Sequence, residues 1–314
     1  MELNRENAKT LYTAYSERFM QGMNGAERHP DAVKAEDIAE IIPSTASSAT
    51  HDWLGQLPVM KEWTGDRSVV SLQLERITVE NLDWEQTVKV PVNAIEDESY
   101  GAYGNLMEAM GGVARQLWID LALKALLANG NWADGKPFFG SGRVLGSGSA
   151  ASTITNAVTA AFSEAALKAA WETMAGWTLD QGRSARAVPT VLLVGPSNYF
   201  AAKKLLRGEL KGGGDTNELR GIVELKMSRD LVGANAGKWF LFGEAGGVKA
   251  LGVQKRKDPQ FTAMDAPNDE NVFTKNEIRY GTHARGSAFL ALPFLAYAGG
   301  LSTVPSAAPA TTES

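Results

Sequence analysis

The sequence contains no cysteine among its 314 residues, so neither a disulfide nor a thiolate metal site can hold the fold. Its only histidines, His29, His51 and His283, stand far apart and lack the spacing of metal ligands. A chain without cysteine is compatible with a reducing cytoplasm. We therefore expect no metal site, and a fold that is held by packing alone.

Long apolar runs are missing too. The longest, Ala288 to Ala298, is too short to span a bilayer, and the N-terminus is polar where a secretory signal would be apolar. The net charge is -5, and the basic residues are scattered apart from the short run Lys255 to Lys257, so nothing attracts nucleic acid in general. We expect a protein that is made in the cytosol, contacts no membrane and does not bind DNA sequence-specifically.

Signatures of catalysis are absent from the sequence as well. No Gly-x-Ser-x-Gly motif occurs, and neither glycine-rich loop, 140–146 or 176–184, has the spacing or the lysine of a nucleotide-binding loop. The acidic residues Asp265, Asp269 and Glu270 lack the regular ligand series of calcium loops. We predict no catalytic residue and no cofactor, and keep a hydrolase built around Ser197 as an alternative.

The composition that remains is globular, with 44% apolar and 21% charged residues. Its strongest pattern is a helix predicted from Asn105 to Ala128, about 35 Å long at 1.5 Å per residue. The spacing places Leu106, Met110, Val113, Leu117 and Leu121 on one apolar face. The acidic run Glu96, Asp97, Glu98 stands just ahead, where a helix start favours carboxylates.

Before this helix, the sequence pattern predicts an amphipathic helix over 4–24. It also predicts an extended arm over 43–67 that carries Trp53 and Trp63. Residues 68–92 alternate like a β-hairpin with its turn near 80–83. The apolar residues of its limbs are Val70, Leu72 and Leu74, then Val88, Val90 and Val92. A lone two-stranded ribbon is marginal in water, so either the body of the chain or a neighbouring chain must cover it.

After the long helix, the pattern predicts an α/β unit. It comprises a helix over 150–175, a strand over 190–194, a helix over 199–206, and strands over 223–227 and 239–242. An apolar strand over 289–298 is interrupted by Pro293, which disfavours a central position in a sheet. The tail from Ser302 is polar and proline-rich, and we expect it to be disordered.

Several short segments in this order resemble the Mu-type major head subunit family of tailed bacteriophages. They are Pro43-Ser-Thr, Trp53 to Pro58, Glu62 to Arg67, Glu85 to Val90, Ile95 to Gly101, Asn268 to Phe273 and Tyr280 to Arg285. The resemblance spans roughly residues 4 to 300. One departure is Phe138 to Arg143, where family members tend to have an Asp-rich segment that contains His-Pro.

The resemblance implies an α+β, HK97-like capsid fold. Its expected parts are an N-terminal helix and arm (1–67), an extended hairpin loop (68–97), a peripheral domain with the spine helix (98–134), an axial domain (135–254), closing strands (255–301) and a disordered tail (302–314). It also implies a major capsid protein without enzymatic activity. A decoration or tail-tube subunit is the alternative within the virion.

The same resemblance implies a shell of pentamers and hexamers around double-stranded DNA, assembled in the bacterial cytoplasm. Its implied partners are identical copies, a scaffolding protein, a maturation protease, a portal and a decoration protein. The candidate interface residues are Trp53, Trp63, Arg67, Val70, Leu72, Leu74, Trp84, Val88, Val90, Glu96, Asp97 and Glu98. We expect Arg67 and the triplet Glu96 to Glu98 to form ion pairs across subunits, with pairing inside the chain as the alternative.

Overall fold

The computed structural model describes residues 5–25, 29–54, 74–97, 100–145, 152–178, 184–210 and 216–308. Its helices are α1 (Arg5–Met23), α2 (Ala35–Ile38), α3 (Val92–Glu96), α4 (Tyr100–Ala128), α5 (Glu164–Gly176), α6 (Pro196–Arg207) and α7 (Glu270–Lys275). Its strands are β1 (Ala39–Pro43), β2 (Ser48–Leu54), β3 (Leu74–Glu80), β4 (Leu82–Pro91), β5 (Arg143–Leu145), β6 (Ser152–Ile154), β7 (Val188–Val194), β8 (Glu224–Met227), β9 (Trp239–Ala245), β10 (Val248–Lys249), β11 (Leu251–Met264), β12 (Glu277–Leu290) and β13 (Ala296–Gly299). Short 3-10 turns, η3 (Gly233–Asn235) and η4 (Pro293–Leu295), precede β9 and β13.

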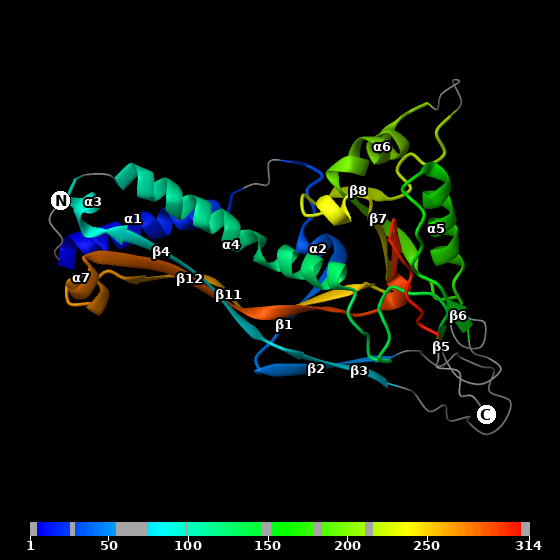
Figure 1. Ribbon diagram of the computed structural model, residues 1–314, viewed down its shortest axis with the longest axis horizontal. Coiled ribbons are helices and arrows are strands. Elements are labelled where there is room, and N and C mark those ends of the chain that lie inside the picture. The colour runs from blue at the N-terminus through cyan, green and yellow to red at the C-terminus, as the bar shows by residue number, and fades with distance from the viewer. Residues whose placement is uncertain are drawn as a thin grey trace.

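One long sheet forms an elongated lobe, with strand order β1-β11-β12-β4 (Figure 1). The antiparallel strands β11 and β12 are 14 residues each and run its full length. β1 pairs with one end of β11, while β4 pairs with the opposite end of β12. Pro43, Lys255, Gly286 and Leu82 share one row across the sheet, so β1 ends where β4 begins.

The predicted long helix is confirmed as α4, which lies along one face of this sheet with α1 beside it (Figure 1). The predicted apolar face is partly wrong, because the helix is rotated. Met107, Met110 and Ala114 are buried against the sheet, whereas Leu106 is 39% and Val113 56% exposed. Sequence spacing defines a face, but which neighbours cover that face is decided by the sheet and by α1.

A second, more compact lobe contains the sheet β10-β9-β7-β8, with β13 paired to β9. The predicted α/β unit is confirmed, since β7 and β8 are parallel and α6 connects them across the sheet. Pro196 occupies the first turn of α6, where its missing N–H costs nothing. Pro293 lies in η4 and not in a strand, so its missing N–H leaves no gap in the strand pairing.

The helix predicted over 150–175 is wrong in its first half. Residues 152–154 form β6, paired with β5, and α5 begins only at Glu164, where the Ser163 Oγ accepts a hydrogen bond from the Ala166 N–H at 3.1 Å. The intervening chain is held extended because buried Asn156 donates hydrogen bonds to the carbonyls of Phe138 and Pro293.

The hairpin predicted over 68–92 is also wrong. β3 pairs with β2, and β4 pairs with β12, so the two limbs belong to different sheets. No reversal occurs at 80–83, because the chain passes straight through Asn81, whose Nδ2 donates to the Ser44 Oγ at 2.9 Å and to the Ala46 carbonyl at 2.8 Å. The extended feature is therefore the β2–β3 ribbon, which lies on the opposite side of the long sheet from α4 (Figure 1).

The tail from Ser302 is ordered as far as Ala308, in contrast to the predicted disorder. The Ser141 N–H donates to the Pro305 carbonyl at 3.0 Å, and the Ala307 N–H donates to the Ser141 carbonyl at 2.8 Å. Ala307 is fully buried against Gly140, where a side chain would collide with it. Backbone pairing and one small apolar residue are enough to order this polar segment.

Candidate assembly surface

Several of the interface candidates predicted from the sequence belong to the β2–β3 ribbon or to the connection between its strands. Its register runs from Ser48 opposite Glu80 to Leu54 opposite Leu74, with Trp53 opposite Glu75. Residues 55–73 connect the two strands beyond this pair. Trp63, Arg67, Val70 and Leu72 fall in that connection and lie outside the described residues, as does Glu98.

The root of the ribbon is covered by its own chain. Val79 is buried, Ile77 packs against the main core, and the ring of His51 stacks on that of Phe289 with centroids 4.7 Å apart. Of the two alternatives left open for covering an extended ribbon, cover by the body of its own chain holds for this part.

Three further interface candidates lie on β4 and point toward α4. The Trp84 Nε1–H donates to the Gly286 carbonyl at 3.0 Å, and the Lys124 ammonium stands 5.8 Å from the centre of its ring. Val88 packs against the core of the elongated lobe, and Val90 is 0% exposed within it. These side chains already have partners in their own chain, so we leave them out of the surface that we propose below.

Glu96 and Asp97 end α3 immediately before the long helix, and both are exposed. They therefore satisfy the minimum condition for ion pairing with another chain.

Sequence reasoning missed an exposed apolar row on α4, which we call the spine stripe. Its members are Ala102, Leu106, Ala109 and Val113. Because three- and four-residue steps return to the same side of a helix, the four lie in one line. The same spacing was visible in the sequence, but it could not tell an inward row from an outward one.

A second exposed apolar group lies at the tip of the elongated lobe, between β11 and β12. Phe273 on α7 is 89% exposed, although the loop itself is firmly held. Buried Asn271 donates to the carbonyls of Met264 at 3.1 Å and Glu277 at 2.7 Å, which ties the ends of both strands together. A rigid loop that displays an aromatic ring is typical of a contact surface.

The face of the long sheet turned away from α4 carries charge. Asp83 lies 3.4 Å from Arg285 and 3.3 Å from His283, and Glu277 bonds to Arg279 at 2.7 Å. The hydrogen bond from Arg279 lowers the pKa of Glu277. Of these residues only Asp83 is exposed and the others are half-buried, so the ion pairs lie at the boundary between the sheet and its surroundings.

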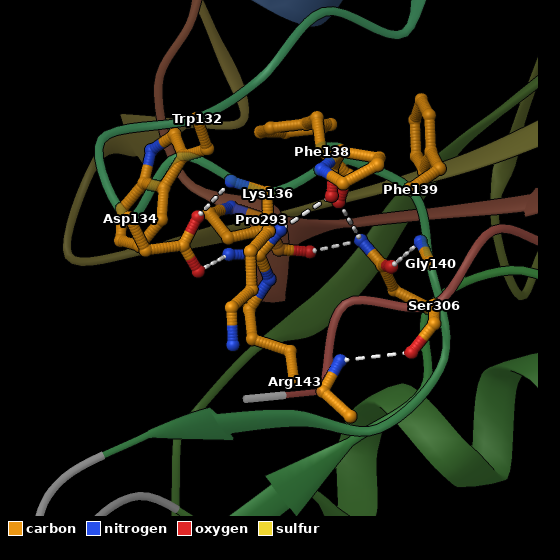
Figure 2. A network of polar contacts seen from close by, with 12 residues as sticks. Trp132, Asp134, Lys136, Phe138, Phe139, Gly140, Arg143, Pro293 and Ser306 are labelled. Carbon is orange, nitrogen blue, oxygen red and sulfur yellow. Dashed lines mark hydrogen bonds and ion pairs between the residues drawn. The ribbon is translucent and has the colours of Figure 1, made fainter. Parts of the chain in front are cut away.

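A polar network joins the end of α4 to the compact lobe and to the C-terminal segment (Figure 2). Buried Arg143 bonds to the Asp134 carboxylate and stacks over Trp132 at 5.2 Å. The Asn156 Oδ1 accepts from the Gly140 N–H at 2.9 Å. One charged group and one amide therefore hold the loop that follows α4 against the segments around Asn156 and Pro293.

A second network anchors the segment that precedes α2. Asp31 is buried, and its carboxylate accepts hydrogen bonds from the Tyr199 hydroxyl, at 2.7 Å, and from Arg207. Burial acts to raise the pKa of Asp31, but these two hydrogen bonds and the Arg207 charge outweigh it and lower the pKa. The Met227 N–H donates to the Asp31 carbonyl at 2.6 Å, so the segment also covers the edge of β8.

Among the described residues, no group of three or more His, Asp or Glu side chains is placed to hold a metal ion. Ser197 is exposed at the start of α6, and none of the hydrogen bonds in the described parts of the chain joins it to a histidine. No helix in the described ranges is long and apolar enough to cross a membrane.

Comparison with solved structures defines the class of protein. A chain of the procapsid of bacteriophage JBD30 superposes with a TM-score of 0.57 at 25% identity, covering 96% of this chain and 77% of that one. A virus-like particle subunit from Pyrococcus furiosus gives 0.54 at 10% identity, covering 91% and 97%. The fold is the HK97-like capsid fold, in an α+β arrangement.

The family follows from the sequence comparisons. The profile of the Mu-like prophage major head subunit gpT matches residues 8–161, 152–231 and 226–303, and the chain belongs to this family. The FluMu major head subunit of Haemophilus influenzae is 25% identical over 281 residues, or 89% of this chain and 68% of that protein. The major capsid protein of Escherichia phage Mu is 29% identical over 118 residues, covering 38% of this chain and 37% of that protein. The chain is thus a major head subunit, a capsid protein that assembles with copies of itself into a virion shell.

Proposed function

We propose that this subunit forms the pentamers and hexamers of an icosahedral shell around double-stranded DNA, and that residues 55–73 of one copy lie on the spine stripe of the next. The observation that carries the proposal is the exposure of Leu106 and Val113 on a helix whose inner face is fully packed. Unpartnered apolar rows on a rigid helix mark contact sites.

The energy available from such a contact is sufficient for assembly. Covering several hundred square ångströms of apolar surface gives on the order of 10 kcal/mol gross per contact at about 25 cal/mol per Å², before the cost of association is subtracted. Many repeated contacts of this size together close a shell, while a single misplaced contact is weak enough to dissociate and form again.

Charged residues add direction to this contact. Exposed Glu96 and Asp97 stand just before the spine stripe, and Arg67 belongs to the connection that would lie over it. We propose that Arg67 pairs with the acidic triplet Glu96 to Glu98 of a neighbouring copy.

The remaining roles also belong to this proposal. The chain encloses DNA without sequence-specific contacts, in keeping with its net charge of -5. It assembles in the host cytoplasm with a scaffolding protein, a maturation protease, a portal and a decoration protein. It performs no catalysis and needs no cofactor. The domain boundaries predicted from the sequence remain predictions.

The test is to replace residues 55–73 by an Asn-Gly turn, which closes the strand pair at Leu54 and Leu74 as a two-residue hairpin. Because the described core is untouched, we expect a folded, soluble subunit that forms neither rings nor shells in negative-stain microscopy and sedimentation. A replacement of equal length by Gly and Ser is the matched control for the loss of side chains alone. Normal particles from both variants would refute the proposal.

A further inference from the structure

Gln254 is 0% exposed, although its side chain is polar. It lies on β11, one residue before the row where β1 ends and β4 begins. That row is also where the β2–β3 ribbon leaves the sheet. Burying an amide costs free energy unless its donor and acceptor are both bonded, so the partners of Gln254 reveal its role.

Both partners of the Gln254 amide belong to the ribbon, one on each strand. The Oε1 accepts from the His51 Nε2–H of β2 at 2.7 Å, and the Nε2 donates to the Val79 carbonyl of β3 at 3.4 Å. Because the Nε2 serves as the donor, the oxygen must be the acceptor, which places a proton on the His51 Nε2. A primary amide is the side chain that supplies both functions at one point.

The apolar contacts around this amide hold the ribbon without setting its direction. The His51 and Phe289 rings are nearly parallel, with an interplanar angle of 15°, and such a stack allows sliding. The Phe289 ring lies over Gly252, where a Cβ would come within 2.3 Å of it. Apolar burial is non-directional, whereas hydrogen bonds weaken steeply with angle. The Asn81 bonds tie together the two segments that lead into the ribbon, and the two amide bonds are directional contacts between β11 and the ribbon strands themselves.

We propose that Gln254 is a positioning residue that sets the angle at which the β2–β3 ribbon leaves the body. It does so by bonding to both strands at the root, so that neither can slide or tilt without breaking a buried hydrogen bond. What this angle means for shell building rests on the function proposed above. The angle itself is a property of the single subunit.

The absence of cysteine makes a direct measurement possible. Spin labels on Thr78→Cys in the ribbon and Lys275→Cys in α7, both exposed, report the ribbon-to-body distance by double electron–electron resonance. Dilution with unlabelled subunit removes distances between copies. In the Gln254→Leu background, we expect the distance distribution to widen about twofold or more, because rigid-body tilting of the ribbon becomes possible. Gln260→Leu, an exposed glutamine on the same strand, is the matched control and should leave the width unchanged.

Two further variants keep the test decisive if Gln254→Leu fails to fold. His51→Phe keeps an aromatic ring for the stack on Phe289 but removes one bond, and Gln254→Glu keeps the bond to His51 but loses the donor to Val79. Each should widen the distribution by less than Gln254→Leu does. Unchanged widths in cooperatively folded variants would overturn the proposal. A wider distance distribution in subunits that still build normal particles would instead support Gln254 as the positioning residue. It would count against the proposed function of the ribbon.

Discussion

Asp120 on α4 lies close enough to Asp230, which follows β8, for the two negative charges to repel each other. Burial, and then the charge of Asp230, raise the pKa of Asp120 to about 6. The folded pKa lies above the unfolded value, so between about pH 4 and pH 6 the folded subunit binds more protons than the unfolded chain. Asp120 therefore lowers stability as pH rises through this window, and the cost persists at neutral pH.

We predict that Asp120→Asn stabilises the subunit at pH 7.5 by about 1 kcal/mol, reduced from the full linkage value because water reaches this side chain. At pH 4 the carboxyl is protonated in the folded subunit and about half protonated in the unfolded chain, so the gain should fall to a few tenths of a kcal/mol. Urea unfolding at the two pH values measures both. Glu172→Gln, an exposed acid on α5, is the control. A gain that is equal at both pH values would contradict the assignment.

At the scale of elements, the closest approach in the elongated lobe is the crossing of α1 and α4. A Cβ on Gly111 would lie 2.1 Å from the Phe19 carbonyl oxygen, and one on Gly22 would lie 1.9 Å from that of Glu108. The helices touch backbone to backbone here, which brings Phe19 and Met110 into one core. Glycine is therefore required by packing at these two positions, despite its cost inside a helix.

We predict that Gly111→Ala destabilises the subunit by about 1–3 kcal/mol, because the added methyl forces the helices apart. The neighbouring Gly112 gives an unusually close control, since a Cβ there meets nothing within 4 Å. Gly112→Ala should stabilise by about 0.5–1 kcal/mol through helix propensity alone. Thermal or urea unfolding compares the pair, and effects of the same sign would show that the crossing is looser than described.

At the scale of the whole molecule, packing is complete on the inner faces and incomplete on selected outer ones. Two cores fill the lobes, and the networks of Arg143 and Asp31 join the segments around them. Exposed apolar side chains include the spine stripe and Phe273, and also single residues elsewhere such as Phe200 on α6. A rigid body with such surfaces suits a shell, in which each copy must present the same contacts to every neighbour.

We predict that Val113→Asp leaves the stability of the subunit within about 0.5 kcal/mol of the wild type, because the side chain is 56% exposed. The same substitution should abolish shell formation by placing a charge on the spine stripe. Gln260→Glu adds an equal charge at an exposed position of β11, outside α4, and it should still assemble. Particle yield by sedimentation and microscopy decides between them.

Much of this architecture was predictable from local patterns. The helix over 105–128 lies within α4, and the strand and helix around Pro196 lie within β7 and α6, because apolar spacing and Pro chemistry act within a few residues. The family resemblance was also visible in short segments spread along the chain. Of the interface candidates, Trp84, Val88 and Val90 turned out to have partners in their own chain. The proposed roles of the others remain predictions.

The sequence by itself determined that 105–128 and 199–206 are helical and that 190–194 is extended, since neighbours along the chain decide these choices. It failed over 150–163, where the bonds of Asn156 to the distant carbonyls of Phe138 and Pro293 hold the chain extended. Only the tertiary structure decided that β3 pairs with β2 and β4 with β12, and that Leu106 and Val113 face outward. It also placed Ala307 against Gly140, which orders a segment whose composition predicts disorder. These outcomes depend on contacts between residues far apart in the chain, and alternation or helical spacing carries no information about which distant surface will cover a given face.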